Sequence, residues 1–547
     1  MGERSETQNT SKLTPEILFQ QSPERLYPKM KLVNTRVFIT EMRKKWGEDM
    51  TLANLPEEEW DTLLEGSFES VYLMGIYKTG TKARDIALQY KEQYIKAFPD
   101  MKDEDVVGSC FSIAQYVPAE HIVSCQNESE DVIWKEFDEK VHDRLNKKGV
   151  KVILDWVPYD EGIDSPLAIT HPELFLQKDE QFVRALPLEE QRLQFEEVVD
   201  KNGVVHYIAH PGPDYDIPWI DKLALDPSNP QVLEHKLEQA KMLSNHCDGL
   251  RVDMAFLWKP EEIQAKWGKD NWMLSEDKIL NIFAHFPYSQ ILPQLFAYRS
   301  EFEIMGEIYR DEDIHELVQV GFTAAYDEKT LKLYKQIVTR EISAIDLIPH
   351  LRWLTEFLVG YRSIEYSENH DIERAIRSMG KKASIVLAAI QIATSRTIYM
   401  AEEGQEVGNQ TPHQPMQLKR APEKESDMEL KALYQRLYRG RNSELFQMGE
   451  HNIAEALPVH PDNTSNKDII VQRSELPSKI GMIQCSNTGN WESACKINIP
   501  EGVKEIRVYD ILNDTWFEGD KITAVDQGGN LFIGLPSYGI QVVYYAY

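Results

Sequence analysis

Apolar and polar positions along the chain repeat in one order, a β-like segment followed by a helical segment. The β-like segments are short, nearly continuous apolar runs, which are typical of strands buried on both faces of a parallel sheet. Between them, segments such as 55–68, 130–149, 227–246 and 382–395 have the length and spacing of helices. We predict eight strands, at 31–42, 70–80, 149–158, 247–256, 302–311, 321–331, 363–371 and 396–408.

This alternation predicts the α/β class and, within it, a (β/α)8 TIM barrel spanning 31–450. After the third strand the order breaks over 156–235, a polar stretch rich in Pro, His and acidic residues. A loop of this length is usually functional or an inserted subdomain. From 451 to 547, short strands separated by turns predict a separate antiparallel β-sandwich domain. Residues 1–30 are expected to form a helical N-terminal extension packed on the outside.

Composition narrows the classes of partner. The 547-residue chain is 42% apolar and carries a formal net charge of −29. That charge argues against nucleic acid and anionic membranes, because both would be repelled, and it is compatible with neutral sugars. No 18-residue apolar run suggests a membrane span, and the first residues lack the apolar centre of a secretory signal. The five cysteines lack metal-like spacing, so we expect a cytoplasmic protein.

Candidate chemistry begins in the strand 247–256, where Leu250, Val252 and Met254 alternate with Arg251 and Asp253. The strand period of 2 places the arginine and the aspartate on one face. A neighbouring guanidinium keeps a carboxylate ionised, as a nucleophile or a charge stabiliser requires. The same pattern also fits a buried structural ion pair, so this strand alone does not decide between the two interpretations.

Further acidic residues stand at the ends of later predicted strands. Glu307 lies among apolar residues, which raises the pKa of a carboxyl as a general acid requires. Asp371 follows His370 at the end of the strand 363–371. An ionised and a protonated carboxyl close together are the requirement for retaining glycoside hydrolysis, and the C-terminal ends of barrel strands form the active-site face of a TIM barrel.

In these segments the chain resembles glycoside hydrolase family 13, the α-amylase family. GLRVD at 249–253 resembles that family's fourth-strand motif, EIMGEIY at 303–309 its fifth-strand segment, and SENHD at 367–371 its seventh-strand motif. VKVILDWVPYDEG at 150–162 resembles the third-strand motif. The stretch 156–235 then takes the place of the family's B domain and 451–547 that of its C domain, so the resemblance covers almost the whole chain.

The resemblance implies roles for individual residues. It makes Asp253 the nucleophile, Glu307 the general acid/base and Asp371 the stabiliser of the transition state. Arg251 and His370 become groups that orient carboxylates and sugar hydroxyls. The implied activity is retaining hydrolysis of α-glucosidic bonds in oligo- or polysaccharides through a covalent glycosyl-enzyme intermediate, with a carbohydrate as the partner.

Three further residues take their assignments from the same resemblance. Asp155 matches the aspartate of the third-strand motif, which supports the architecture of the site. Phe111 or Tyr116 is expected to supply an aromatic platform under the −1 sugar, because the segment 108–116 falls where the family often has one.

Two departures from the family pattern stand out. Tyr159 and Asp160 occupy the positions of the usual Asn-His pair, and a tyrosine is a poor calcium ligand. We therefore expect the family's structural calcium site to be altered, and we predict no cofactor and no metal-binding residue. Phe256 and Leu257 replace the Lys-His found in many α-amylases, which makes the plus subsites more apolar than in a starch endo-hydrolase.

The sequence also fits functions other than hydrolysis. A sugar or phosphate can intercept the same covalent intermediate, so a transglycosidase or phosphorylase fits the motifs equally. A noncatalytic amylase-like scaffold that binds glucan or protein is the alternative from another class, although the chain keeps all three carboxylates. A nucleotide-dependent enzyme is disfavoured because the phosphate-binding glycine motifs are absent. The oligomeric state does not follow from the sequence.

Overall fold

The computed structural model describes residues 13–547 except 125–128, 213–217, 270–271, 412–415, 423–425 and 518–524.

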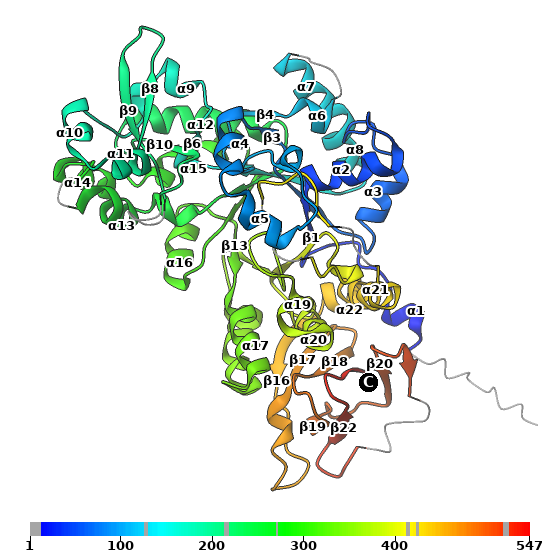
Figure 1. Ribbon diagram of the computed structural model, residues 1–547. Helices are drawn as coiled ribbons and strands as arrows, with labels where there is room; N and C mark the ends of the chain where they lie inside the picture. Colours follow the sequence, from blue (N-terminus) through cyan, green and yellow to red (C-terminus); the bar gives the residue numbers. More distant parts are fainter. Residues whose placement is uncertain are drawn as a thin grey trace, which may run out of the picture.

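Eight parallel strands close into a barrel in the centre of the molecule (Figure 1). Each strand pairs in parallel with its two neighbours, and β1 closes the ring by pairing with β15. The predicted (β/α)8 fold is therefore confirmed. In barrel order the strands are β1 (Lys29–Asn34), β2 (Ser70–Met74), β5 (Lys151–Trp156), β11 (Gly249–Val252), β12 (Glu303–Gly306), β13 (Ala324–Asp327), β14 (Arg362–Glu365) and β15 (Thr397–Glu402).

The first strand differs from its predicted range of 31–42. It begins at Lys29 and ends at Asn34, and the remainder of the predicted strand belongs to helix α2 (Thr35–Trp46). The side chain of Asn34 accepts a hydrogen bond from the backbone N–H of Val37 at 3.4 Å and so caps this helix. The β-branched residues that suggested a strand are buried on the inner face of the helix, where packing overrides intrinsic propensity.

Helices follow the strands and surround the barrel. The segment after β2 adds β3 (Tyr77–Lys78), α4 (Thr81–Leu88), α5 (Lys91–Ala97), β4 (Gln115–Pro118) and α6 (Glu120–Val123). The other barrel helices are α3 (Glu57–Leu63), α7 (Glu130–Phe137), α8 (Asp143–Lys147), α12 (Pro230–Ser244), α13 (Pro260–Ile263), α14 (Glu276–Ala284), α15 (Pro287–Tyr298), α16 (Asp311–Gln319), α17 (Lys329–Thr339), α18 (Ile348–Arg352), α19 (Ala375–Met379), α20 (Lys381–Ile392), α21 (Met428–Asn442) and α22 (Glu444–Gln447).

The polar stretch after β5 has small sheets of its own. The strands β7 (Gln177–Lys178), β9 (Val205–Ala209) and β8 (Phe195–Val199) form one sheet, and β6 (Asp160–Gly162) pairs with β10 (Lys222–Ala224) in another. The short helices are α9 (Leu167–Thr170), α10 (Glu180–Ala185) and α11 (Leu188–Gln194). In the second sheet Lys222 lies opposite Gly162, which brings that lysine back to the end of the third barrel strand.

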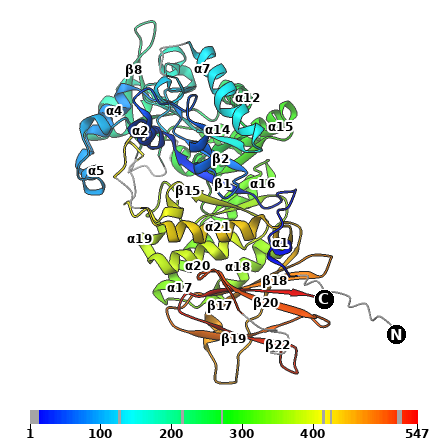
Figure 2. The ribbon, with the colours of Figure 1, turned by 90° about the vertical axis from the view of Figure 1, so that its right-hand side faces the viewer.

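The C-terminal strands lie at the end of the molecule opposite the β8–β9 hairpin (Figure 2). They pack on the barrel through α20, where the side chain of Gln484 donates to the carbonyl of Ala389 at 3.0 Å. A separate apolar core fills the space between the two C-terminal sheets. One sheet has the order β16 (Glu450–Ala454), β17 (Ile469–Glu475), β18 (Ile480–Asn487), β23 (Ile540–Ala546), β20 (Glu505–Asp510), β21 (Thr515–Trp516), and the other pairs β19 (Ser493–Asn498) with β22 (Asn530–Leu535).

The described part of the N-terminal extension is mostly not helical. Its one helix is the single turn α1 (Pro15–Leu18). Leu13 is buried, and its carbonyl accepts a hydrogen bond from Arg507 of the C-terminal domain at 2.7 Å. The domain boundaries drawn from the sequence stay a prediction.

The four described cysteines are free and buried, and Cys125 lies outside the described residues. Within the described residues, no helix combines the length and the apolar character needed to cross a membrane.

Candidate active site

Three neighbouring barrel strands position the central residues of the site. In the register of β5, β11 and β12, Arg251 lies beside Asp155 on one side and Met305 on the other. Asp253 and Glu307 each follow immediately after the end of their strands, β11 and β12. Since the strands are parallel, both carboxylates emerge at the C-terminal face of the barrel.

Arg251 joins three carboxylates in the buried floor of the site. One terminal nitrogen lies 2.6 Å from Asp253 and 3.7 Å from Asp155, and the other lies 2.8 Å from Glu307. The guanidinium is only 1% exposed. Because its two terminal nitrogens belong to one rigid planar group, the carboxyl groups of Asp253 and Glu307 are held close together in a fixed orientation.

Asp253 is surrounded by groups that favour its ionised form. The Tyr159 hydroxyl donates a hydrogen bond to Oδ2 of Asp253 at 2.8 Å, and Nζ of Lys222 lies 3.6 Å from the same oxygen. Burial acts to raise the pKa of Asp253. The positive charges of Lys222 and Arg251, together with the hydrogen bonds, outweigh burial and hold that pKa below its usual value.

Glu307 has the opposite electrostatic balance. Burial raises its pKa to about 7, the negative charge of Asp253 adds to the rise, and Arg251 opposes it. Oε2 of Glu307 accepts a hydrogen bond from the backbone N–H of Met254 at 2.8 Å, and Oε1 accepts one from the Tyr309 hydroxyl. Met254 holds this position in the left-handed region, with φ of 39°, a strained conformation that is concentrated at functional sites.

Asp371 and His370 approach from the end of β14. Nε2 of His370 lies 3.1 Å from Oδ2 of Asp371. Burial acts to lower the pKa of His370, but the Asp371 carboxylate outweighs it and the pKa is raised. The His370 ring also packs against Phe111, with ring centroids 5.6 Å apart.

The predicted carboxylates Asp253, Glu307 and Asp371 open onto one cavity of about 420 Å³. A volume of this size suits a sugar-sized ligand, and pockets of this kind combine apolar walls with a few polar groups. The remaining lining residues are Ser109, Phe111, Trp219, Asp221, Lys222, Met254, Tyr309, Met416 and Gln417.

The structure separates the two candidates for the aromatic platform. Phe111 lines the cavity and lies 5.1 Å from the guanidinium carbon of Arg251. Tyr116 does not reach the cavity. Its hydroxyl donates to the carbonyl of Val157 at 3.1 Å and accepts from the N–H of the same residue at 2.8 Å, so it fixes the end of the third strand instead. Asp155 lies below the cavity, where it accepts hydrogen bonds from the Tyr72 hydroxyl and the backbone of Gly75.

The sequence pattern did not indicate several residues that lie at the site. Tyr309 follows Glu307 by two positions, and strand alternation could have indicated that both share a face. Trp219 and Lys222 belong to the polar stretch after the third strand, which carries no periodic signal that points toward the barrel. Their place depends on the pairing of β10 with β6.

Tyr159 and Asp160, which depart from the third-strand pattern, both lie in the surroundings of Asp253. Tyr159 donates to Asp253, and Asp160 lies 3.3 Å from Nζ of Lys222. Burial raises the pKa of Asp160 to about 8, against the opposing effect of Lys222. A tyrosine, an aspartate and a lysine therefore form one buried wall next to Asp253.

Comparison with known proteins identifies the fold. No family model and no curated protein sequence matches this chain. Its structure is similar to a maltogenic α-amylase from Thermotoga neapolitana, at 15% identity and a TM-score of 0.63, over 95% of this chain and 99% of that one. An α-amylase from Lactobacillus plantarum gives 17% identity and a TM-score of 0.61, over 95% and 99% of the two chains.

A debranching enzyme from Nostoc punctiforme is similar at 13% identity and a TM-score of 0.61, over 96% of this chain and 99% of that one. At identities this low the similarity establishes the fold. The chain has the fold of the α-amylases over nearly its whole length.

Proposed function

We propose that this protein is a divergent member of the α-amylase family and a retaining glycoside hydrolase that acts on α-glucosidic bonds of oligo- or polysaccharides. One observation carries the proposal. A single buried guanidinium holds the carboxyl groups of Asp253 and Glu307 together at the floor of a cavity, and the surroundings lower the pKa of one and raise the pKa of the other. Paired carboxyls with opposite pKa shifts are the signature of acid and nucleophile in one site.

In the proposed first step, protonated Glu307 donates its proton to the glycosidic oxygen while a carboxylate oxygen of Asp253 attacks the anomeric carbon. The bond from that carbon to the leaving oxygen breaks, and an ester bond to Asp253 forms. Asp371 stabilises the positive charge that develops on the sugar ring, and Arg251 keeps the two reacting carboxyl groups in place.

In the second step, Glu307 has become a carboxylate and accepts a proton from a water molecule. The resulting hydroxide attacks the anomeric carbon, the ester bond to Asp253 breaks, and both residues return to their starting protonation states. Two displacements at one carbon retain its configuration, so the released sugar is the α-anomer.

The pH dependence of the rate follows from the same two pKa values. Glu307 is active when protonated, so kcat/KM is expected to fall as the pH rises through about 7. Asp253 is active when ionised and its pKa lies below the usual value, so the rate is expected to hold until the pH is below the ordinary range of an aspartate. A pH profile of kcat/KM on an unactivated α-glucoside measures both limbs, and a rate that still rises above pH 8 would contradict the assignment of Glu307.

Lys222 is expected to act as a positioning residue for Asp253. Replacing it by methionine removes the cation 3.6 Å from Asp253, so the pKa of Asp253 rises and the acidic limb of the pH profile moves to higher pH. We expect kcat/KM at neutral pH to fall on the order of ten-fold. Lys332→Met, at an exposed position, is the matched control. An unchanged acidic limb in a folded Lys222→Met variant would show that the lysine has only a structural role.

The proposed function is tested by product analysis on a panel of α-glycosides. The panel holds maltooligosaccharides, sucrose, trehalose and aryl α-glucosides, each with and without phosphate, beside the corresponding aryl β-glucosides. Proton NMR during the first turnovers identifies the anomer that is released. The proposal predicts hydrolysis of at least one α-glycoside with the α-anomer formed first, and no turnover of the β-series.

Other outcomes separate the remaining interpretations. Release of the β-anomer first would exclude the retaining mechanism. Longer oligosaccharides or a glycosyl phosphate as the main product would replace hydrolysis by transfer to a sugar or to phosphate, with the same covalent intermediate. No turnover of any member of the panel, in a protein that still binds glucan, would favour a noncatalytic scaffold.

A further inference from the structure

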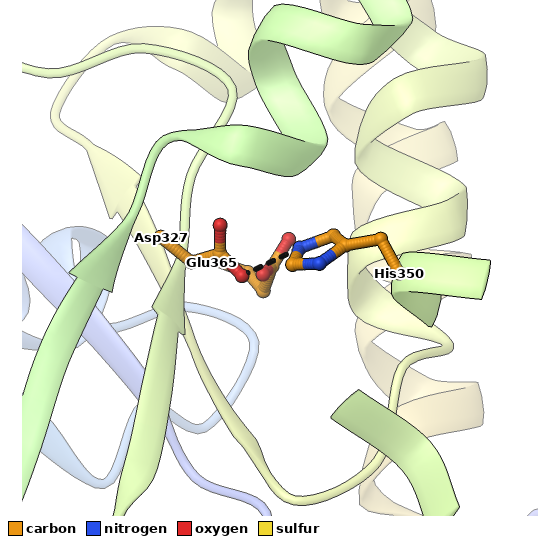
Figure 3. Close-up of side chains that lie close together, drawn as sticks. All are labelled: Asp327, His350 and Glu365. Atoms are coloured by element: carbon orange, nitrogen blue, oxygen red, sulfur yellow. Dashed lines mark hydrogen bonds and ion pairs between the residues drawn. The ribbon is translucent and has the colours of Figure 1, made fainter. Parts of the chain in front are cut away.

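A second group of potential ligands lies outside the catalytic cavity. Asp327 is the last residue of β13, Glu365 is the last residue of β14, and His350 belongs to α18. Figure 3 shows the three side chains pointing toward one another from two adjacent strands and the facing helix. All three are buried, and Glu365 is fully inaccessible.

The strands separate this group from the catalytic site. Tyr326 and Tyr366 stand next to Asp327 and Glu365 in the sequence, and successive strand residues face opposite sides of a sheet. These tyrosines face inward, where Tyr326 lies 5.8 Å from the guanidinium carbon of Arg251 and 5.4 Å from Tyr366. Asp327 and Glu365 therefore face outward, into the layer between the barrel and its helices.

The geometry suits a bound ion. One nitrogen or oxygen atom from each of Asp327, His350 and Glu365 lies within 4.8 Å of the other two. Nε2 of His350 is 2.8 Å from Oδ2 of Asp327, and the imidazole ring stacks on Trp353 at 5.9 Å, which fixes its direction. Oε2 of Glu365 has no hydrogen-bond partner among the described residues. A buried carboxylate oxygen normally has a hydrogen-bond partner or binds an ion. This one has no such partner in the part of the chain that the structure describes and faces two further potential ligands, so a bound ion would satisfy it.

The charges lead to the same conclusion. Among the described residues, Asp327 has an ion pair only with His350, and Glu365 has none. Two carboxylates that face each other in a low-dielectric interior repel each other. A divalent cation between them balances their two negative charges and also uses the neutral imidazole as a ligand.

We propose that Asp327, His350 and Glu365 bind one divalent transition-metal ion of the zinc type, which ties α18 to the barrel strands β13 and β14. An imidazole nitrogen with two carboxylates suits zinc, whereas calcium takes six to eight oxygen ligands. Three protein ligands leave a fourth position for water. The site is structural, since its ligands are buried behind the barrel wall and away from the cavity, and it does not depend on the glycosidase assignment.

Metal content and thermal unfolding of the full chain test this proposal. The protein is stripped with a chelator and dialysed against micromolar Zn²⁺, Co²⁺ or Ca²⁺ in parallel, and bound metal is measured by elemental analysis. We expect about one equivalent of Zn²⁺ or Co²⁺ and none of Ca²⁺. We also expect a higher melting temperature with Zn²⁺ than without it, and a visible absorption band from bound Co²⁺.

Matched variants assign the ligands. Glu365→Gln and His350→Gln are each expected to lower bound Zn²⁺ at least about ten-fold and to abolish the rise in melting temperature. Glu312→Gln and His315→Gln, at exposed positions on α16, are expected to bind as the wild type does. Circular dichroism confirms that each variant is folded, and two independent ligand variants guard against misfolding of one.

Three results would overturn the proposal. These are less than a tenth of an equivalent of Zn²⁺ in the wild type, equal metal content in folded Glu365→Gln, or uptake of Ca²⁺ alone. In the first case Asp327 and Glu365 share a proton instead of a metal. None of these readouts uses enzymatic turnover, so failure here and failure of the proposed function are distinguishable.

Discussion

Replacing Asp253 by asparagine is expected to lower kcat on every α-glycoside that the wild type cleaves by about 10⁴-fold or more. The amide is a poor nucleophile and cannot form the ester intermediate, so the two-step pathway is closed. Asparagine is close to aspartate in size, and its one amide oxygen can still accept the hydrogen bond of either Tyr159 or Arg251. KM and the melting temperature are therefore expected to change much less than kcat. Steady-state kinetics and a thermal melt on one preparation measure all three quantities.

A smaller side chain at this position gives a sharper test of the nucleophile. Asp253→Gly leaves space above the anomeric carbon, and a small anion such as azide can enter it. Azide then attacks an activated aryl α-glucoside, the bond to the aryl oxygen breaks, and one inversion gives a β-glucosyl azide. Asp85→Asn, on the surface, is the control and is expected to keep wild-type activity. Turnover by folded Asp253→Asn at the wild-type rate would contradict the assignment of Asp253 as the nucleophile.

The parts of the site that lie on barrel strands were predictable from the sequence. The alternation of strand-like and helical segments predicts parallel strands, and this places Asp253 and Glu307 at strand ends on one face of a barrel. Asp371, which the seventh-strand motif indicated, follows beyond the end of β14. The structure brings all three to one cavity. Asp327 is the last residue of β13, yet it faces outward, because its neighbour Tyr326 faces inward. A carboxylate at a strand end is therefore not sufficient evidence for a place in the site.

The parts that depend on tertiary pairing were not predictable in this way. Lys222 reaches Asp253 because β10 returns to pair with β6, and a polar stretch without periodicity does not reveal that pairing. Phe111 and Tyr116 lie in one segment, and no local pattern tells which ring faces the cavity. The hydroxyl of Tyr116 decides the matter, since it is satisfied by the backbone of Val157.

Replacing Glu307 by glutamine is expected to separate substrates by the quality of their leaving groups. An amide cannot donate the proton that a departing sugar alkoxide needs, so kcat/KM on maltooligosaccharides is expected to fall by about 10³-fold. A dinitrophenyl leaving group departs without protonation, so the first step on such a substrate is expected to be slowed far less. The second step still lacks its base, and the glycosyl-enzyme is expected to accumulate, with an initial burst of the phenol followed by slow turnover.

The pH profile of the Glu307→Gln variant carries the argument one step further. If the carboxyl with pKa of about 7 is Glu307, the alkaline limb of kcat/KM disappears in the variant and the acidic limb, which reports Asp253, remains. Glu303 lies at the other end of the same strand, in an ion pair with Lys151. The control variant Glu303→Gln is expected to keep both limbs of the pH profile. Equal losses on activated and unactivated substrates, with the alkaline limb unchanged, would assign the acid to another residue. Intact Asp253 would then still form the ester bond, and only the source of the proton would have to be sought elsewhere along the cavity wall.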